Sequence, residues 1–180
     1  MEVFQGRPAD VTGRLEKEIA VYDLLDQLDI PFRRVDHDHA DTMEMCQEID
    51  QALGQDICKN LFLCNRQKTK FYLLLMPGDK PFKTKDLSAQ IGSSRLSFGG
   101  PADMERLLNL TPGSVTVLGL MYDPDCQVTL LIDQDLYQQT AFGCHPCINT
   151  SSLKLRTADV LETFLPAVHH EPIFVHLTGE

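Results

Sequence analysis

Two apolar runs separated by a short polar turn constrain the fold of this chain more than any other feature. Residues 57–64 are apolar apart from Lys59 and Asn60, and the run at 70–76 is apolar beyond its first residue. The turn between them, residues 65–68, is entirely polar. Continuous apolar runs of this length are typical of strands that are buried on both faces. The pattern therefore predicts a hairpin of buried strands.

Helices and further strands alternate along the rest of the chain. Apolar spacing and capping residues predict helices over 14–29, 42–53, 86–91, 101–108 and 157–165, with Thr42, Thr84 and Thr157 as caps. Short strands are predicted at 32–36, 95–98, 152–155 and 173–177, and a second hairpin from 115–120 and 127–133. The fold class expected is α/β (α+β), with a mixed or largely antiparallel sheet.

Length and composition fit one folded domain. The 180 residues are 43% apolar, and no internal repeat or linker divides them, so residues 1–180 are expected to form a single domain. No window reaches the ~18 consecutive apolar residues of a membrane span. The first ten residues contain acids and no apolar run, which does not fit a secretory signal. We expect a cytoplasmic protein with no membrane contact and no disulfide framework.

Charge is distributed unevenly. The net charge is -10, which argues against broad nucleic-acid binding through phosphate neutralisation. Residues 59–95, however, hold eight of the sixteen basic residues and only two acids, so this segment carries +6 and the remainder -16. Two interpretations stay open. The segment is either a basic patch that touches a few phosphates or a solvated, lysine-rich hairpin and turn.

The segment 142–150 admits two incompatible interpretations. Cys144 and Cys147 have the spacing of a redox dithiol or of part of a zinc site. Against both, the residues that follow lack a helical period, Pro146 lies inside the pair, and no second cysteine pair supplies the remaining ligands. The alternative is a polar substrate-binding loop built on His145, Pro146, Asn149 and Thr150. We expect no metal and no cofactor.

Lys59 is the second residue with two interpretations. A lysine at the edge of a buried strand commonly extends its ammonium group to solvent. Alternatively, the cation lies in a cleft, where it binds a phosphate or polarises an ester. Lys59 and Asn60 point to opposite faces of a regular strand, so both serve one site only where the strand ends or bulges. No Gly-x-Ser-x-Gly or Walker motif offers another centre.

Taken together, several stretches resemble one family. They are residues 58–63, 94–99, 110–116, the Gly119-Leu120 pair with Asp123, the loop 145–150, and the ending 159–174. These resemble the YbaK/ProX superfamily of aminoacyl-tRNA deacylases, and most closely its free-standing prolyl-tRNA editing proteins of the ProX/PrdX type. The resemblance covers about residues 15–177 in the expected order.

The resemblance implies a fold and an activity. The fold is a single domain like YbaK and the insertion domain of prolyl-tRNA synthetase, with a mixed, curved β-sheet flanked by helices. The activity is trans-editing: hydrolysis of the aminoacyl ester of mischarged tRNA(Pro), with Ala-tRNA(Pro) as the first expectation. Cys-tRNA(Pro), or non-catalytic sensing of an amino acid or charged tRNA, is the alternative. The partners implied are the tRNA acceptor end and, as a further candidate, prolyl-tRNA synthetase. Oligomeric state is not indicated.

The resemblance also implies roles for individual residues. Lys59 and Asn60 are the expected catalytic residues, in a neutral pocket that excludes proline by its size. The expected substrate-binding residues are Ser97, Gly143, His145, Pro146, Asn149 and Thr150.

Overall fold

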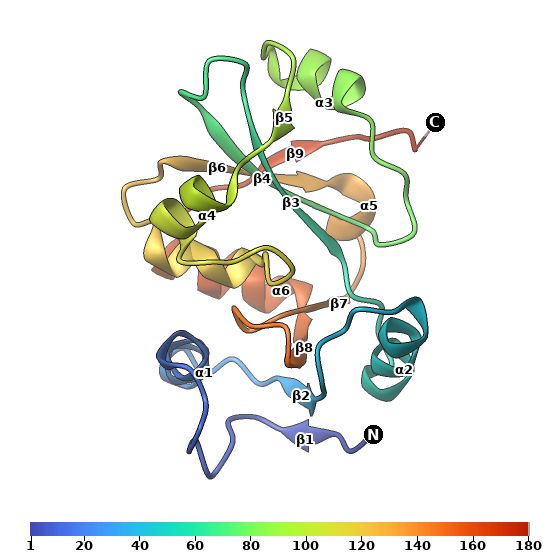
Figure 1. Ribbon diagram of the computed structural model, residues 1–180, viewed down its shortest axis with the longest axis vertical. Helices are drawn as coiled ribbons and strands as arrows, with labels where there is room; N and C mark the ends of the chain where they lie inside the picture. The colour runs from blue at the N-terminus through green and yellow to red at the C-terminus, as the bar shows by residue number, and fades with distance from the viewer. Residues whose placement is uncertain (180) are drawn as a thin grey trace.

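The computed structural model describes residues 1–179, whose strands form two sheets with helices around them (Figure 1). In chain order the elements are β1 (Phe4–Gln5), α1 (Glu16–Gln27), β2 (Arg33–Asp36), α2 (Met43–Leu53), β3 (Lys59–Cys64), β4 (Phe71–Met76), α3 (Thr84–Ile91), β5 (Ser97–Phe98), α4 (Pro101–Leu108), the 3-10 helix η1 (Val117–Tyr122), β6 (Val128–Asp133), α5 (Gln134–Tyr137), β7 (Ala141–Cys144), β8 (Ser151–Arg156), α6 (Thr157–Asp159), the π-helical turn η2 (Val160–Phe164), α7 (Leu165–Ala167) and β9 (Ile173–Val175).

The predicted hairpin is confirmed as the centre of a five-stranded sheet with the order β5-β3-β4-β6-β9. Strands β3 and β4 are antiparallel, with Lys59 opposite Met76 and Cys64 opposite Phe71. All six residues of β4 are buried, as the unbroken apolar run predicts. Because β6 pairs in parallel with both β4 and β9, this sheet is mixed.

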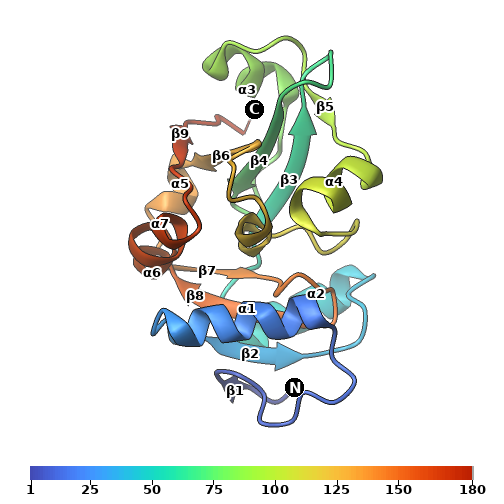
Figure 2. The same ribbon diagram turned by 90° about the vertical axis from the view of Figure 1, so that its left-hand side faces the viewer.

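The remaining strands form a separate antiparallel sheet in the order β1-β2-β8-β7, so the fold class is confirmed but its strands are divided between two sheets. Figure 2 shows the two sheets one above the other, with α1 lying across the four-stranded sheet. The ring of Tyr22 on α1 stacks on Phe32 with centroids 5.6 Å apart. Strand β1 was not predicted, because two residues are too few to show an alternating pattern.

The second predicted hairpin is wrong. Residues 117–122 form the buried 3-10 helix η1, and β6 pairs with β4 rather than with this segment. Thr116 begins the helix by accepting a hydrogen bond from the Leu118 amide. Gly119 packs so closely that a Cβ atom there would lie 2.7 Å from Leu110 Cδ1. A short buried apolar run fits a strand or a helix equally well, and close packing decided between them.

Helix boundaries follow the predicted signals in most places. Thr42 caps α2 by accepting from the Met45 amide, and Gly54 ends that helix in the left-handed conformation at φ 66°. Thr84 and Thr157, predicted as caps, are instead the first helical residues, and neither flanking residue makes a side-chain capping bond. Within the described residues, no helix is both long enough and apolar enough to span a bilayer.

Candidate active site

A cavity of about 690 Å³ lies where the start of β3, helix α2 and the loop between β7 and β8 meet. Its volume falls within the range of small-molecule sites. The lining comprises Ala40, Asp41, Thr42, Met43, Cys46, Gln47, Ile49, Asp50, Asp56, Ile57, Lys59, Gly78, Asp79, Gly113, His145, Asn149 and Ser152. Of the eight predicted site residues, this cavity brings together Lys59, His145 and Asn149.

The close packing of Gly143 against the start of β3 brings Lys59 and the 145–150 loop together. The Cys58 amide donates to the Gly143 carbonyl at 3.1 Å, and the Gly143 amide donates to the Asp56 carbonyl at 3.2 Å. A Cβ atom on Gly143 would lie 2.6 Å from Ile57 Cδ1 and 3.1 Å from the Asp56 carbonyl oxygen, so glycine favours the close approach of β7 to the start of β3. Gly143 is buried and joins the two sheets behind the cavity.

Lys59 presents a cation to the cavity. Its side chain is half-buried, and Nζ donates to the carbonyl oxygen of Lys80. Lys80 is itself held in place, because its Nζ atom pairs with Asp133 at 2.7 Å and with Asp135 at 2.6 Å. An ammonium group has three donors, so one bond to a carbonyl leaves two N–H groups of Lys59 for a ligand.

His145 is held as a neutral imidazole with a defined tautomer. Its Nδ1 lies 2.9 Å from the Ser151 carbonyl oxygen, which can only accept, so Nδ1 carries the proton. Burial lowers the pKa of His145, and the neighbouring His37 lowers it further, although the bond to Ser151 acts in the opposite direction. At neutral pH, Nε2 is therefore an unprotonated acceptor on a side chain that lines the cavity.

A hydrogen-bond chain extends from His145 through Ser152 to His37. Ser152 Oγ lies 3.3 Å from His145 Nδ1 and 2.9 Å from His37 Nε2. His37 Nδ1 lies 2.7 Å from the Asp38 carbonyl, which fixes the proton on that nitrogen. The Ser152 hydroxyl therefore donates to His37 and accepts from His145. Neither His37 nor Ser152 was predicted from the sequence as a site residue.

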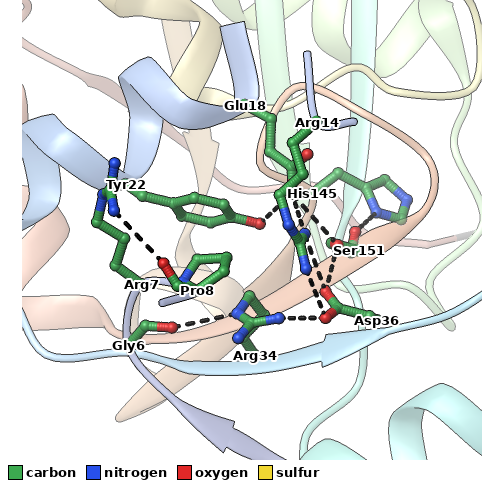
Figure 3. A network of polar contacts seen from close by, with 10 residues as sticks. All are labelled: Gly6, Arg7, Pro8, Arg14, Glu18, Tyr22, Arg34, Asp36, His145 and Ser151. Atoms are coloured by element: carbon green, nitrogen blue, oxygen red, sulfur yellow. Dashed lines mark hydrogen bonds and ion pairs between the residues drawn. The ribbon is translucent and has the colours of Figure 1, made fainter. Parts of the chain in front are cut away.

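A polar network anchors the strand residue whose carbonyl orients His145 (Figure 3). Ser151 Oγ donates to Asp36 Oδ1 at 2.7 Å, and Asp36 also accepts from Arg14 Nη2 at 2.9 Å and from Arg34. Burial alone would raise the pKa of Asp36, but these donors outweigh it and hold the pKa at about 2. Asp36 is thus a carboxylate at neutral pH and fixes the start of β8.

Glu18 extends the same network into helix α1. This carboxylate is 1% exposed, accepts from Arg14 Nη1 at 2.6 Å, and accepts from the Tyr22 hydroxyl at 2.6 Å. Burial and the Glu18 charge raise the pKa of Tyr22, so its hydroxyl remains a donor. A buried charge needs such partners to be tolerated. Helix α1 and strand β2 together therefore support the loop that carries His145.

The other predicted site residues lie around the cavity or away from it. Asn149 lines this cavity and a neighbouring one of about 350 Å³, which Thr150 also lines, and the buried Asn149 Oδ1 has no hydrogen-bond partner among the described residues. Pro146 is a buried residue of the loop itself. Ser97 is exposed on β5, 3.6 Å from Cys64 Sγ, and does not line the cavity.

Asn60 points away from the cavity, as the alternation of a regular strand requires. Its Nδ2 donates to the Cys58 carbonyl at 3.2 Å and approaches Cys58 Sγ at 3.3 Å. Its Oδ1 is buried without a hydrogen-bond partner in the described structure. Strand β3 is regular here, with Asn60 opposite Leu75, so it does not bulge to bring both side chains to one face.

The cavity is acidic rather than neutral. Asp41, Asp50, Asp56 and Asp79 line it, with Lys59 as the lining lysine. Burial raises the pKa of Asp50, even though its carboxylate accepts from the Ile57 amide. The expectation of a neutral pocket is wrong, because these aspartates come from polar loops and a helix face that carry no motif in the sequence. Carboxylates at this site favour a ligand that carries an amino group.

Cys144 and Cys147 are packing residues in this structure. Both thiols are free and buried. Burial raises the pKa of Cys147 to about 12 and raises that of Cys144 well above its usual value. Thiolate is the reactive form, so this environment argues against the redox interpretation. The described residues also contain no group of three or more His, Cys, Asp or Glu side chains that could hold a metal ion.

The fold and the cavity together define a small α/β domain with a cationic and an imidazole group at one cavity. The model of the aminoacyl-tRNA editing domain matches residues 37–163, and the chain belongs to that family. The expected enzyme class, an aminoacyl-tRNA deacylase, is confirmed by this membership, as is the resemblance to the YbaK/ProX superfamily.

Individual relatives agree with this assignment. The chain is 30% identical over 146 residues to the prolyl-tRNA editing protein ProX of Acetoanaerobium sticklandii, covering 81% of this chain and 89% of that protein. It is 30% identical over 172 residues to prolyl-tRNA synthetase associated domain-containing protein 1 of Xenopus laevis, covering 92% and 99%. A crystal structure described as a candidate trans-editing enzyme for prolyl-tRNA synthetase shares the fold, with a TM-score of 0.64 at 14% identity over 91% of this chain and 98% of that one.

Proposed function

We propose that this protein is a trans-editing enzyme that hydrolyses mischarged tRNA(Pro), with Ala-tRNA(Pro) as its main substrate. The single observation that carries the proposal is the meeting of Lys59 Nζ and the neutral His145 ring at one cavity. The names of its relatives, a prolyl-tRNA editing protein among them, support tRNA(Pro) as the RNA. We further propose that prolyl-tRNA synthetase, in the cytoplasm, supplies the mischarged tRNA.

The reaction needs no covalent nucleophile, because an aminoacyl ester is already activated. A water molecule attacks the ester carbonyl carbon, gives up one proton and forms a tetrahedral oxyanion. The C–O bond to the ribose then breaks, the ribose oxygen takes up the proton that the water released, and a free amino acid and uncharged tRNA are released. In this proposal the two free N–H groups of Lys59 stabilise the oxyanion or orient the terminal ribose, and the cavity holds the water close to the ester.

His145 and the cavity carboxylates bind the aminoacyl group in this proposal. The α-amino group of an aminoacyl ester is a donor, and the Nε2 lone pair of His145 is an acceptor. The aspartates around the cavity attract the same ammonium group. The ring of proline is larger than the alanine side chain and replaces one N–H, so a pocket shaped for alanine excludes proline by size and loses a hydrogen bond to it.

Cys-tRNA(Pro) is the second candidate substrate. Cysteine differs from alanine by one sulfur atom, and the lining contains Met43 and Cys46, whose polarizable sulfurs suit a thiol. A non-catalytic sensor of charged tRNA is the remaining alternative. It would bind the same ligand at the same cavity without turnover.

The Lys59→Ala variant tests the catalytic assignment. Removal of one oxyanion donor typically lowers kcat by about 100-fold or more. We expect a loss of this size in single-turnover hydrolysis of Ala-tRNA(Pro), measured as release of labelled alanine. The matched control is Lys154→Ala, because Lys154 Nζ also donates to a backbone carbonyl, that of Gly54, but lies outside the cavity. Full deacylase activity in Lys59→Ala would refute the role of this lysine.

A further inference from the structure

One end of the molecule gathers exposed basic side chains. The β3–β4 turn, helix α3 and strand β5 lie together at the top of both Figure 1 and Figure 2. Six of the eight basic residues of the 59–95 segment are exposed on these elements or directly beside them. They are Arg66, Lys68, Lys70, Lys83, Lys85 and Arg95, which we call the basic end.

The charged side chains of the basic end take no part in the ion pairs that stabilise the fold. None of the six forms an ion pair within the described part of the chain, whereas Arg7, Arg14, Arg34, Lys80, Arg106 and Arg156 all do. The two acids of the segment do not neutralise it. Asp79 lines the cavity, and Asp86 accepts hydrogen bonds from the Thr178 amide and from Gln90. The positive charge is therefore available to an external partner.

An aromatic pair with one exposed ring, Phe98, and one partly buried ring, Phe82, lies beside the basic end. Phe98 is 63% exposed, and its ring meets that of Phe82 edge-on with centroids 6.4 Å apart. Phe98 is opposite Leu63 in the β3–β5 register, so its side chain lies on the face of β3 that also carries Lys59. Cations around an exposed aromatic ring are the combination that binds single-stranded nucleic acid, through phosphate contacts and base stacking.

The net charge of the rest of the protein disfavours other docking directions for a polyanion. Outside residues 59–95 the chain carries a net charge of -16, against +6 within them. A partner rich in phosphate is repelled by the acidic body and attracted to the basic end. The distance along β3 from the basic end to Lys59 at the cavity is five residues, or about 17 Å.

We propose that the basic end and the Phe82–Phe98 pair form the surface that binds the tRNA substrate, with its backbone on the cations and an unpaired base on Phe98. This inference rests on the proposed function and adds to it the face on which the RNA lies. The cavity carries the chemistry, and the basic end supplies RNA affinity some 17 Å away.

Binding and turnover are to be measured on three variants of the full chain. The first is Lys68→Gln/Lys70→Gln, the second is Phe98→Ala, and the third is the control Arg33→Gln/Lys154→Gln, which removes two basic residues from neighbouring positions on the other sheet. Uncharged tRNA(Pro) is the binding probe, titrated by fluorescence anisotropy over a range of salt concentrations. Hydrolysis of Ala-tRNA(Pro) gives kcat and KM. Thermal unfolding of each variant checks the fold.

Both basic-end variants are expected to weaken tRNA binding about tenfold and to raise KM with kcat unchanged. The lysine variant should also lower the slope of log Kd against log salt by one to two. The control pair should bind as the wild type does. Equal loss in the control pair, wild-type affinity in both basic-end variants, or no tRNA binding by the wild type would overturn the proposal.

The same data separate this inference from the proposed function. Lys59→Ala should keep its affinity for uncharged tRNA while losing hydrolysis. Wild-type hydrolysis with unchanged KM in the basic-end variants would refute the RNA surface and leave the editing function standing. Binding at the basic end without hydrolysis of any aminoacyl ester would refute the editing function alone.

Discussion

The protonation state of His145 connects the site geometry to a measurable pH profile. Burial and His37 lower its pKa from 6.5, so the ring is neutral at pH 7. As the pH falls below 6.5 and through the lowered pKa, His145 gains a proton and Nε2 changes from an acceptor to a donor. Activity that depends on this acceptor is therefore constant near neutrality and lost on the acidic side.

We expect kcat/KM for Ala-tRNA(Pro) to fall with a single inflection below pH 6.5, which is to be followed by rapid-quench hydrolysis. His145→Gln retains a side chain of similar reach but titrates nowhere in this range, so its activity should be lower and free of that inflection. An unchanged inflection in His145→Gln would assign it to another group, and His37 would be the next to replace.

At the level of single residues, the lining of the cavity includes some of the residues singled out in the sequence. The resemblance singled out Lys59, His145 and Asn149, and all three line one cavity. The alternation of side chains along a regular strand predicted that Asn60 points to the opposite face of β3 from Lys59. Ser152, His37 and the four aspartates were not predicted, because each comes from a different loop or element and only the tertiary fold brings them together.

At the scale of elements, the Asp36 network ties α1 and β2 to the start of β8. Asp36→Asn removes the charge that pairs with Arg14 and Arg34. We expect the free energy of unfolding at pH 7 to fall by about 1–2 kcal/mol, measured by urea denaturation. The control is Asp23→Asn, since the Arg7–Asp23 pair is exposed and should contribute less than about 1 kcal/mol.

The pH dependence of this difference follows from the direction of the shift. The pKa of Asp36 is lowered from 3.8 to about 2, so its contribution is present above pH 3.8 and is lost as the pH falls toward 2. The stability gap between wild type and Asp36→Asn should close over that interval. A gap that stays constant from pH 7 to pH 2 would show that the carboxylate charge is not the stabilising group.

The prediction of elements succeeded where a local signal was strong. The buried hairpin, helix α2 between Thr42 and Gly54, and helix α4 beginning at Pro101 are all present. The hairpin predicted at 115–133 was wrong because pairing partners are a non-local choice. Strand β6 pairs with β4, which lies more than fifty residues earlier in the chain, and with β9, about forty residues later. No periodicity within either segment contains that information.

At the scale of the whole molecule, the proposed function depends on the division of the strands into two sheets and on the separation of acidic from basic residues. The division of the strands into two sheets could not be predicted from the sequence, because the junction depends on the close approach of Gly143 to residues 56–58. The cavity lies at that junction. The segregation of charge, in contrast, could be counted from the sequence, and the structure shows that six of the basic side chains are exposed without ion pairs in its described part.

We propose that this cavity hydrolyses mischarged tRNA(Pro) and spares the correctly charged product. The direct test is to incubate the wild-type protein with tRNA(Pro) charged with alanine, cysteine or proline and to follow loss of each ester against a buffer control. We predict rapid loss of Ala-tRNA(Pro), slower loss of Cys-tRNA(Pro) and no loss of Pro-tRNA(Pro) beyond the buffer rate. Buffer-rate loss of all three esters would contradict the account.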